Sequence, residues 1–212
     1  YDIMNDLMSL GMHRLWKRRF VETVDLKENE IVLDVGSGSG DIAIEILKED
    51  LPTNLYLLDL NEEMLLEGRK RLKKEKNIKY FIGNAEKLNF ENNFFDKYTI
   101  SFCLRNVTEY LLSIKEAYRV LKPGGKYCCL EFSTPKSSLI SSSYKIYKSK
   151  ILPLLGEIVA KDKNAYKYLS ESIDLFPSQE ELSKNLRDCG FTKVETINLF
   201  NGIVAIHTGY KL

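Results

Sequence analysis

The sequence predicts an α/β fold built around a parallel β-sheet. Over the first two thirds of the chain, short apolar runs alternate with amphipathic stretches, a pattern typical of βαβ units. A glycine-rich turn follows the first apolar run, and from residue 134 the β-like alternation gives way to helical spacing. The 212 residues, 44% of them hydrophobic, suffice for one well-buried core, so we expect a single domain.

Five strands are expected where apolar runs are bounded by glycine or polar residues. They cover residues 31–35, 55–58, 78–82, 97–102 and 126–132. Apolar residues at helical spacing predict helices over residues 41–49, 62–74 and 110–121, the last of which should stop at Pro123-Gly124-Gly125. Towards the end of the chain we expect a helix over residues 180–189, capped by Gly190. A strand pair over residues 191–199 and 202–210, joined by Asn201-Gly202, should follow it.

Changes of pattern divide the single domain of residues 1–212 into parts. These are an N-terminal helical cap (1–30), a core that carries the glycine turn (31–133), a helical insertion (134–180), and a C-terminal helix with a strand pair (181–212). The insertion is inferred because aromatic and aliphatic residues between Tyr144 and Leu169 follow helical spacing. We expect it to cover an edge or an open end of the sheet.

Composition excludes several classes of function. With 31 Lys+Arg against 30 Asp+Glu, the net charge of +1 provides no overall field for holding nucleic acid, so we expect no nucleic-acid partner. The apolar stretches are shorter than the roughly 20 residues that a membrane-spanning helix needs. Four cysteines without C-x-x-C spacing and two histidines form no metal-site pattern, so we expect no metal and a reducing, intracellular environment.

The strongest motif is Asp34-Val35-Gly36-Ser37-Gly38-Ser39-Gly40, between a predicted strand and a predicted helix. Glycines allow a tight turn and a close approach of the backbone to a ligand, while the helix N-terminus offers unpaired N–H groups. A dinucleotide fingerprint needs glycine at the sixth position, where Asp41 stands when the motif is read from Gly36. The pattern therefore disfavours a nicotinamide oxidoreductase and favours a nucleoside ligand, with Asp34 either meeting a cation or organising the turn.

Polar residues also follow the next two predicted strands. Asp59 lies 19 residues beyond Gly40, where a carboxylate can accept hydrogen bonds from both hydroxyls of a ribose. The alternative for Asp59 is a cap for the helix that follows. Asn84-Ala85-Glu86 would contact an adenine with its amide and backbone groups, or it forms an ordinary solvated loop.

Arg105 and Asn106 follow the fourth predicted strand, near the point where open parallel sheets bind ligands. They would polarise a substrate oxygen or fix a water molecule. The alternative is a structural arginine paired with an acid such as Glu109 or Glu131. For the histidines and for the tryptophan near the N-terminus, a packed structural role is the preferred interpretation.

Seven segments together resemble one family, the ubiquinone/menaquinone biosynthesis C-methyltransferases, which are class I S-adenosylmethionine-dependent methyltransferases. They are YDIMNDLMSLGMHRLWKRRF, LDVGSGSGDIA, GNAEKLNF, FCLRNVTE, AYRVLKPGGKYCCLEFS, LPLLGEIVAKDKNAYKYLSESI and GIVAIHTGYKL. They run from Tyr1 to Leu212. Many methyltransferases share the glycine motif, whereas the opening, the LRNV segment and the closing segment are close to family-specific.

The resemblance implies a Rossmann-like sheet of seven strands with the last strand antiparallel, and S-adenosylmethionine lying across the strand ends. The glycine motif, from Asp34 through Gly36, Gly38 and Gly40, would bind the methionine side of this cofactor. Asp59 would hold the ribose.

The remaining site residues are also implied by the resemblance. Asn84 and Ala85 would meet the adenine. Arg105, Asn106 and Tyr1 would act on the substrate, because the reaction must fix a quinol oxygen or a water molecule. The guanidinium of arginine stays protonated and therefore cannot accept a further proton. We accordingly expect Arg105 to act by electrostatics and by positioning water.

The implied substrate is 2-polyprenyl-6-methoxy-1,4-benzoquinol, methylated on a ring carbon in ubiquinone biosynthesis. It is favoured over a demethylmenaquinol because GIVAIHTGYKL and CCLEFS resemble the mitochondrial branch. The insertion would form an apolar wall for the polyprenyl tail, and Lys145, Lys148 and Lys150 would touch lipid headgroups or simply face solvent.

We accordingly expect peripheral contact with the matrix side of the mitochondrial inner membrane, the alternative being the bacterial cytoplasm. Other ubiquinone-biosynthesis proteins are expected partners, and a homodimer is an alternative assembly. A non-catalytic scaffold subunit is the alternative from another functional class.

Overall fold

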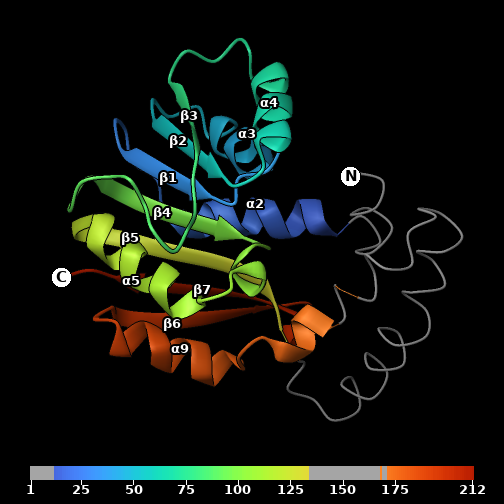
Figure 1. The fold of residues 1–212 in the computed structure, drawn as a ribbon, viewed down its shortest axis with the longest axis vertical. Coiled ribbons are helices and arrows are strands. Elements are labelled where there is room, and N and C mark those ends of the chain that lie inside the picture. The colour runs from blue at the N-terminus through green and yellow to red at the C-terminus, as the bar shows by residue number, and fades with distance from the viewer. Residues whose placement is uncertain (1–11, 134–167, 169–170) are drawn as a thin grey trace, which may run out of the picture.

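The computed structural model describes residues 12–133, 168 and 171–212. Within them, seven strands form one sheet in the order β3-β2-β1-β4-β5-β7-β6 (Figure 1). The strands are β1 (Ile31–Val35), β2 (Asn54–Asp59), β3 (Ile78–Ile82), β4 (Phe95–Ser101), β5 (Leu121–Phe132), β6 (Thr192–Leu199) and β7 (Val204–Tyr210). The first five pair in parallel, and β7 runs antiparallel to both β5 and β6. The predicted seven-stranded sheet with an antiparallel last strand is confirmed.

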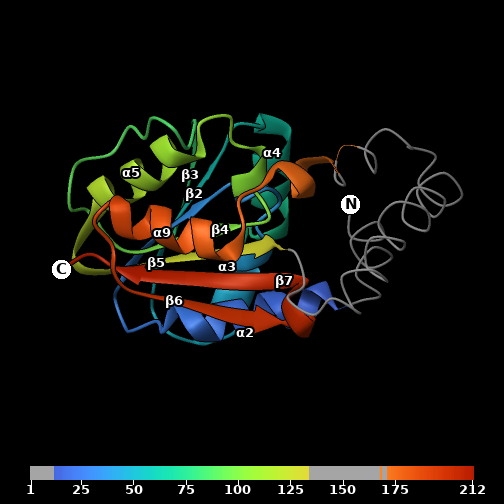
Figure 2. The same cartoon turned by 90° about the horizontal axis from the view of Figure 1, so that it is seen from below.

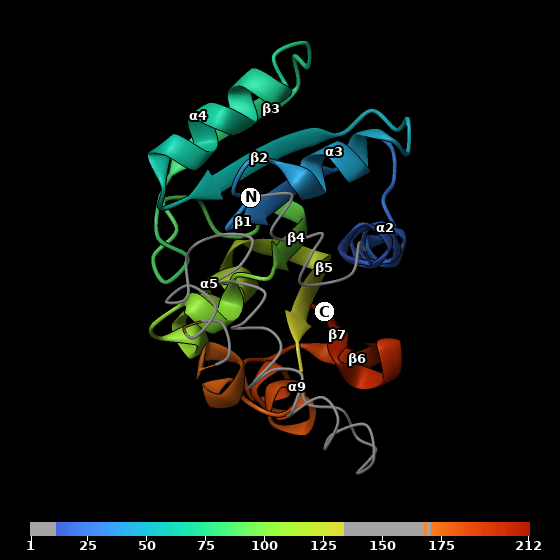
Figure 3. The same cartoon turned by 90° about the vertical axis from the view of Figure 1, so that its right-hand side faces the viewer.

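Helices cover both faces of this sheet. They are α2 (His13–Val24), α3 (Asp41–Leu47), α4 (Glu62–Arg71), α5 (Tyr110–Val120) and α9 (Gln179–Asp188). Figures 2 and 3 show α5 and α9 on one face and α2 and α3 on the other. Because side chains alternate along a strand, Leu33 packs into the core beneath α5 and α9, whereas its neighbour Val32 packs into the core beneath α2 and α3.

The helices begin and end where the sequence provides capping groups. Asn61 accepts a hydrogen bond from the backbone N–H of Met64 and so starts α4, and Ser178 does the same for α9 through the N–H of Glu181. Gly190, predicted as the stop of the last helix, has a φ of 104° two residues after α9 ends. These local signals explain why the predicted boundaries of both helices agree with the structure to within a few residues.

Two connections differ in detail from the prediction. Helix α5 ends at Val120 as expected, but β5 begins at once with Leu121, so the Pro123-Gly124-Gly125 turn lies inside a long, irregular strand. The hairpin between β6 and β7 is confirmed, and it contains a short 3-10 turn, η4 (Phe200–Gly202), in which Asn201 and Gly202 both have positive φ. The Asn-Gly pair supplies the left-handed conformations that this reversal requires.

Several expectations fall on residues outside the described part of the chain. These include Tyr1, Lys145, Lys148, Lys150 and most of the insertion at 134–180; residues 171–175 are described and helical. In the part of the chain that the structure describes, every helix is too short or too polar to cross a bilayer.

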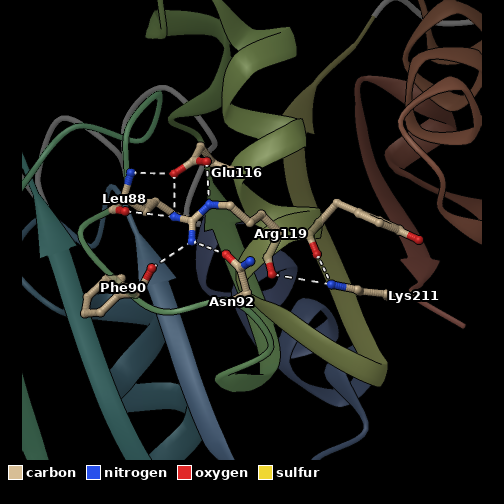
Figure 4. A network of polar contacts seen from close by, with 7 residues as sticks. Leu88, Phe90, Asn92, Glu116, Arg119 and Lys211 are labelled. Atoms are coloured by element: carbon tan, nitrogen blue, oxygen red, sulfur yellow. Dashed lines mark hydrogen bonds and ion pairs between the residues drawn. The ribbon is translucent and has the colours of Figure 1, made fainter.

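A network around Arg119 of α5 anchors the loop between β3 and β4 (Figure 4). The guanidinium donates to the carbonyls of Leu88 and Phe90 and to Asn92 Oδ1, at 2.7–2.8 Å. It also pairs with Glu116, which in turn accepts from the backbone N–H of Leu88 at 2.7 Å. The start of this loop carries Asn84 and Ala85, so the network holds in place a segment that forms part of the predicted site.

The strand order creates a crevice at the carboxyl ends of β1 and β4. The chain runs outward from β1 to β2 and β3, and then returns to place β4 on the other side of β1. The loops after β1 and β4 therefore lead in opposite directions, and open α/β sheets bind ligands at such a switch point.

Candidate active site

A cavity of about 570 Å³ opens at this crevice. Loops that follow the first five strands form its wall, together with part of α2. The predicted residues that line it are Gly36, Gly38, Asp59, Asn84, Ala85, Arg105 and Asn106. Asp34 and Gly40 do not line it, and Tyr1 lies outside the described residues. The structure thus brings seven of the ten predicted site residues to one cavity.

The glycine turn after β1 forms the floor of the cavity. Gly36, Gly38 and Gly40 have φ values of 64°, 53° and 84°, a region that residues with a side chain rarely adopt. At Gly36 a Cβ atom would lie 2.2 Å from Cys103 Sγ, so the strand end fits only with glycine there. Gly40 is the N-cap of α3 and packs against Leu72, away from the cavity.

Asp59, the last residue of β2, links two parts of the cavity wall. Its Oδ2 accepts a hydrogen bond from the backbone N–H of Gly38, and its Oδ1 accepts one from the N–H of Asn61, both at 2.8 Å. Asn61, not Asp59, caps α4. Each carboxylate oxygen retains a second lone pair, so the side chain can shape the turn and still accept from hydroxyls of a ligand.

Asn84 and Ala85 follow β3 on the same side of the cavity. The side chain of Asn84 accepts from the N–H of Glu86 at 2.9 Å, which makes a local turn, and Ala85 is buried. Glu86 then accepts from the backbone N–H of Glu109, beyond β4, at 2.9 Å. This bond ties the loop after β3 to the loop after β4, so it connects two walls of the cavity.

Arg105 and Asn106 belong to a short 3-10 turn, η1 (Leu104–Asn106), after β4. Arg105 Nη1 donates to the carbonyl of Phe102 at 2.7 Å and to both carboxylate oxygens of Glu131, at 2.5 and 3.0 Å. From the sequence, Glu109 and Glu131 are both candidate acidic partners of Arg105, and in the structure the partner is Glu131. Arg105 nevertheless lines the cavity, so the ion pair and contact with a ligand are compatible. Asn106 Oδ1 accepts from the hydroxyl of Tyr168 at 3.3 Å.

Three aromatic side chains form an apolar part of the wall beside Arg105. The ring centroids of Phe102 and Phe132 are 4.9 Å apart, and each lies 6.4 Å from that of Trp16 in α2. Phe102 has a φ of 51°, a strained value for a bulky residue and one that recurs at functional sites. The sequence favours a packing role for Trp16; this side chain is buried, and it also lines the cavity.

Helix α2 also brings Lys17 to the cavity, which the sequence does not predict. Lys17 Nζ lies 2.5 Å from Asp41 Oδ2, and Arg71 of α4 contacts the other oxygen of Asp41 at 2.7 Å and the carbonyl of Ser39 at 3.1 Å. Burial acts to raise the pKa of Asp41, but the two cations outweigh it, so this pKa lies below its usual value. The contacts of Lys17 and Arg71 with Asp41 and Ser39 thus hold the end of the glycine turn.

Asp34 sits beneath the cavity in the body of β1. Its side chain is almost completely buried, Oδ1 accepts from Thr99 Oγ1 at 2.8 Å, and Oδ2 has no hydrogen-bond partner in the described residues. Burial raises the pKa of Asp34 to about 7, and the bond from Thr99 opposes this only in part. In the structure the Asp34 side chain therefore links β1 to the neighbouring strand β4.

The comparisons with known proteins agree with this geometry. The ubiE/COQ5 methyltransferase family matches residues 1–211. The chain belongs to this family. The ubiquinone/menaquinone biosynthesis C-methyltransferase UbiE of Rickettsia bellii (strain RML369-C) is 50% identical over 219 residues, which cover 100% of this chain and 88% of the relative. The UbiE protein of Rickettsia prowazekii (strain Madrid E) is 49% identical with the same coverage.

Solved structures show the same fold at much lower identity. A SAM-dependent methyltransferase from Aquifex aeolicus superposes with a TM-score of 0.70 at 18% identity, over 100% of this chain and 98% of its own. Phosphoethanolamine N-methyltransferase 2 of Haemonchus contortus, in complex with S-adenosyl-L-methionine, has a TM-score of 0.70 at 17% identity, over 92% of this chain and 52% of its own. This member of the ubiE/COQ5 methyltransferase family is a class I enzyme whose cofactor is S-adenosylmethionine.

The cavity of this ubiE/COQ5 family member fits that cofactor. Its volume of about 570 Å³ lies within the range of roughly 300–1,000 Å³ that is usual for small-molecule sites. Gly36 and Gly38 bring backbone to the cavity wall, and Asp59 offers free lone pairs at one side. The roles of Asp59 towards the ribose and of Asn84 and Ala85 towards the adenine stay predictions. Among the described residues there is no cluster of three or more metal-ligating side chains.

The Asp34→Asn variant of this ubiE/COQ5 family member should be stabilised above neutral pH. Between the usual carboxyl pKa of 3.8 and about 7, folded Asp34 keeps a proton that the unfolded chain has released. The free energy of unfolding therefore falls as pH rises through this window, and asparagine removes that loss. Urea unfolding should show a gain of a few kcal/mol at pH 8 and about a third of that gain at pH 5.

The exposed Asp50 provides the control, because Asp50→Asn removes a carboxylate that folding does not bury. This variant should follow the pH dependence of the unchanged protein. An Asp34→Asn protein with the wild-type pH dependence would contradict the raised pKa of Asp34.

Proposed function

We propose that this chain methylates a ring carbon of 2-polyprenyl-6-methoxy-1,4-benzoquinol in ubiquinone biosynthesis. The observation that carries the proposal is one cavity with two kinds of wall. The glycine turn and Asp59 form the side suited to the cofactor, and Arg105 with the aromatic residues Phe102 and Phe132 forms the other. The names of the Rickettsia relatives support the same substrate class.

The aromatic wall suits a quinol ring. Phe102, Phe132 and Trp16 offer flat apolar surface, on which an aromatic ring gains about 0.5–1.5 kcal/mol beyond the burial of its area. Arg105 stands over the Phe132 ring at 5.3 Å, so a ring placed on this surface would bring its oxygen towards the guanidinium. The walls of the cavity would also exclude water, which strengthens the electrostatic interactions inside it.

The chemistry divides between cofactor and protein. When bound, S-adenosylmethionine supplies an electrophilic methyl group. The quinol carbon becomes nucleophilic as a ring hydroxyl loses its proton, and Arg105 would stabilise the resulting oxyanion. Asn106 would hold the water that carries away this proton, and later the proton of the methylated ring carbon. Alignment of the reactants by the cavity wall contributes further, because oriented reactants reach effective molarities of about 10⁵ M or more.

Mass spectrometry of the reaction products tests the proposal. The purified protein is incubated with S-adenosylmethionine and a chemically reduced, short-tailed methoxybenzoquinol, beside a demethylnaphthoquinol. We expect the benzoquinol to gain one methyl group on a ring carbon. A gain on the naphthoquinol alone would assign the protein to menaquinone synthesis, which the relatives' names also include. If the cofactor binds and neither quinol gains a methyl group, catalysis by the isolated chain is contradicted and a scaffold role is favoured.

We also propose a location and partners. The segments GIVAIHTGYKL and CCLEFS, similar to the mitochondrial branch, support a peripheral position on the matrix side of the mitochondrial inner membrane. The bacterial relatives support the alternative, the bacterial cytoplasm. Fractionation of source cells, followed by cross-linking, would separate these locations and identify other ubiquinone-biosynthesis proteins or a second copy of the chain as partners.

A further inference from the structure

Glu131 and Arg105 form a buried ion pair at the edge of the cavity. The side chain of Glu131 is 2% exposed and that of Arg105 is 10% exposed. Glu131 lies near the carboxyl end of β5 and is not part of the cavity wall, whereas Arg105 is. The hydrogen bonds of Glu131 therefore reach the cavity wall through Arg105.

Stability alone does not explain a carboxylate at this place. Taking an ion pair out of water costs several kcal/mol per ion, and apolar residues of similar volume in its place are often as stable or more stable. A buried pair is better explained when its geometry orients a group that acts elsewhere. Arg105 is such a group, because it lies between Glu131 and the cavity.

The hydrogen bonds of Arg105 are distributed unevenly over its guanidinium. Both oxygens of Glu131 and the carbonyl of Phe102 accept from the same nitrogen, Nη1. In the described chain Nη2 has no hydrogen-bond partner, and Nε is buried without one. The guanidinium also lies over the Phe132 ring at 5.3 Å, which restricts its plane. One nitrogen of the group is thus held firmly, and of the other two only Nη2 is not enclosed by the protein.

We propose that Glu131 is a positioning residue for methyl transfer, which holds Arg105 by Nη1 so that an N–H group of Nη2 meets the substrate oxygen. The proposal rests on the quinol C-methylation proposed above. Loss of the Glu131 carboxylate would let the guanidinium turn away from the oxyanion that it stabilises. A misplacement of about 1 Å is enough to cost on the order of 100-fold in rate.

The pair should also respond to pH. Burial raises the pKa of Glu131 to about 7, and Arg105 lowers it only in part. The other described groups that interact with the Glu131 charge are the thiols of Cys103, beside η1, and Cys129, on the same strand; burial raises the pKa of both, so they stay neutral near pH 7. As pH falls through about 7, Glu131 gains a proton and its hold on the guanidinium weakens.

The test compares Glu131→Gln with Glu30→Gln in the benzoquinol assay. Glu30 pairs with the buried Lys97 at the amino ends of β1 and β4, outside the cavity wall, so it controls for the loss of a largely buried pair between a glutamate and a cation. We expect Glu131→Gln to lower kcat by about tenfold or more, with unchanged affinity for S-adenosylmethionine by calorimetry. The decline of kcat below about pH 7 should be present in the wild type and in Glu30→Gln, and absent in Glu131→Gln.

Three results would overturn the proposal. They are wild-type kcat in Glu131→Gln, an equal loss in Glu30→Gln, and an unchanged pH profile in Glu131→Gln. If Glu131→Gln does not fold, Glu131→Asp replaces it, because it keeps the charge but withdraws the carboxylate by one carbon. Its kcat should then be reduced with the pH profile retained, and full kcat would count against the proposal. A wild-type protein that methylates no quinol would instead contradict the proposed function.

Discussion

The Gly36→Ala variant is expected to lose about 3 kcal/mol of its free energy of unfolding and most of its affinity for S-adenosylmethionine. The φ of 64° at Gly36 disfavours any side chain, and a Cβ atom would overlap both Sγ and Cβ of Cys103, at 2.2 and 2.6 Å. Relief of this overlap requires the end of β1 to move away from the loop after β4. Both segments form the cavity, so its shape should change with the fold.

Urea unfolding and calorimetric titration with S-adenosylhomocysteine measure these two effects. Gly124→Ala is the matched control, because Gly124 has a φ of 85° and no atom lies within 4 Å of the position that a Cβ would take there. It should cost about 1 kcal/mol through backbone conformation alone and leave ligand affinity unchanged. Equal losses in the two variants would show that the space around Gly36 is unimportant.

Asp59→Ala is expected to weaken cofactor binding by roughly 10-fold to 150-fold, which corresponds to about 1.5–3 kcal/mol for hydrogen bonds to a charged group. Two causes act together. The variant removes the predicted acceptor for the ribose, and it also frees the N–H of Gly38, which Asp59 holds at 2.8 Å. The glycine turn would then have to be ordered by the ligand itself, which costs part of the binding energy.

Asn61→Ala separates the shape of this turn from the contact with the ligand. Asn61 caps α4 at the same bend, so its loss should lower stability by about 1 kcal/mol while leaving the Asp59–Gly38 bond intact. We expect a much smaller loss of affinity than in Asp59→Ala. If Asp59→Ala binds the cofactor as tightly as the wild type by calorimetry, the ribose is held elsewhere.

The parts of the fold and site that are predictable depend on local chemistry. Strands and helices follow from apolar periodicity and from caps such as Ser178. The positions of Gly36, Asp59 and Arg105 at one edge of the sheet follow from counting along βαβ units, because parallel strands place their carboxyl ends together.

The unpredicted parts depend on contacts between distant segments. Trp16 and Lys17 precede the sheet, and no local pattern indicates that α2 crosses to the cavity. The aromatic and cationic character of this helix is the only available signal, and it fits a packing helix equally well. The choice of Glu131 as partner of Arg105 likewise depends on the depth of β5 in the sheet, which a single sequence does not specify.

The position of Trp16 also gives the protein an intrinsic fluorescent probe of the cavity wall. Trp16 is the one tryptophan of the sequence, it is 5% exposed, and it lies against Phe102 and Phe132 in the cavity wall. Indole emission responds to the polarity and packing of its surroundings, so light selectively absorbed by tryptophan reports on this one place in the molecule. Entry of a quinol can thus be followed in the unlabelled chain by fluorescence, without turnover and on the time scale of binding.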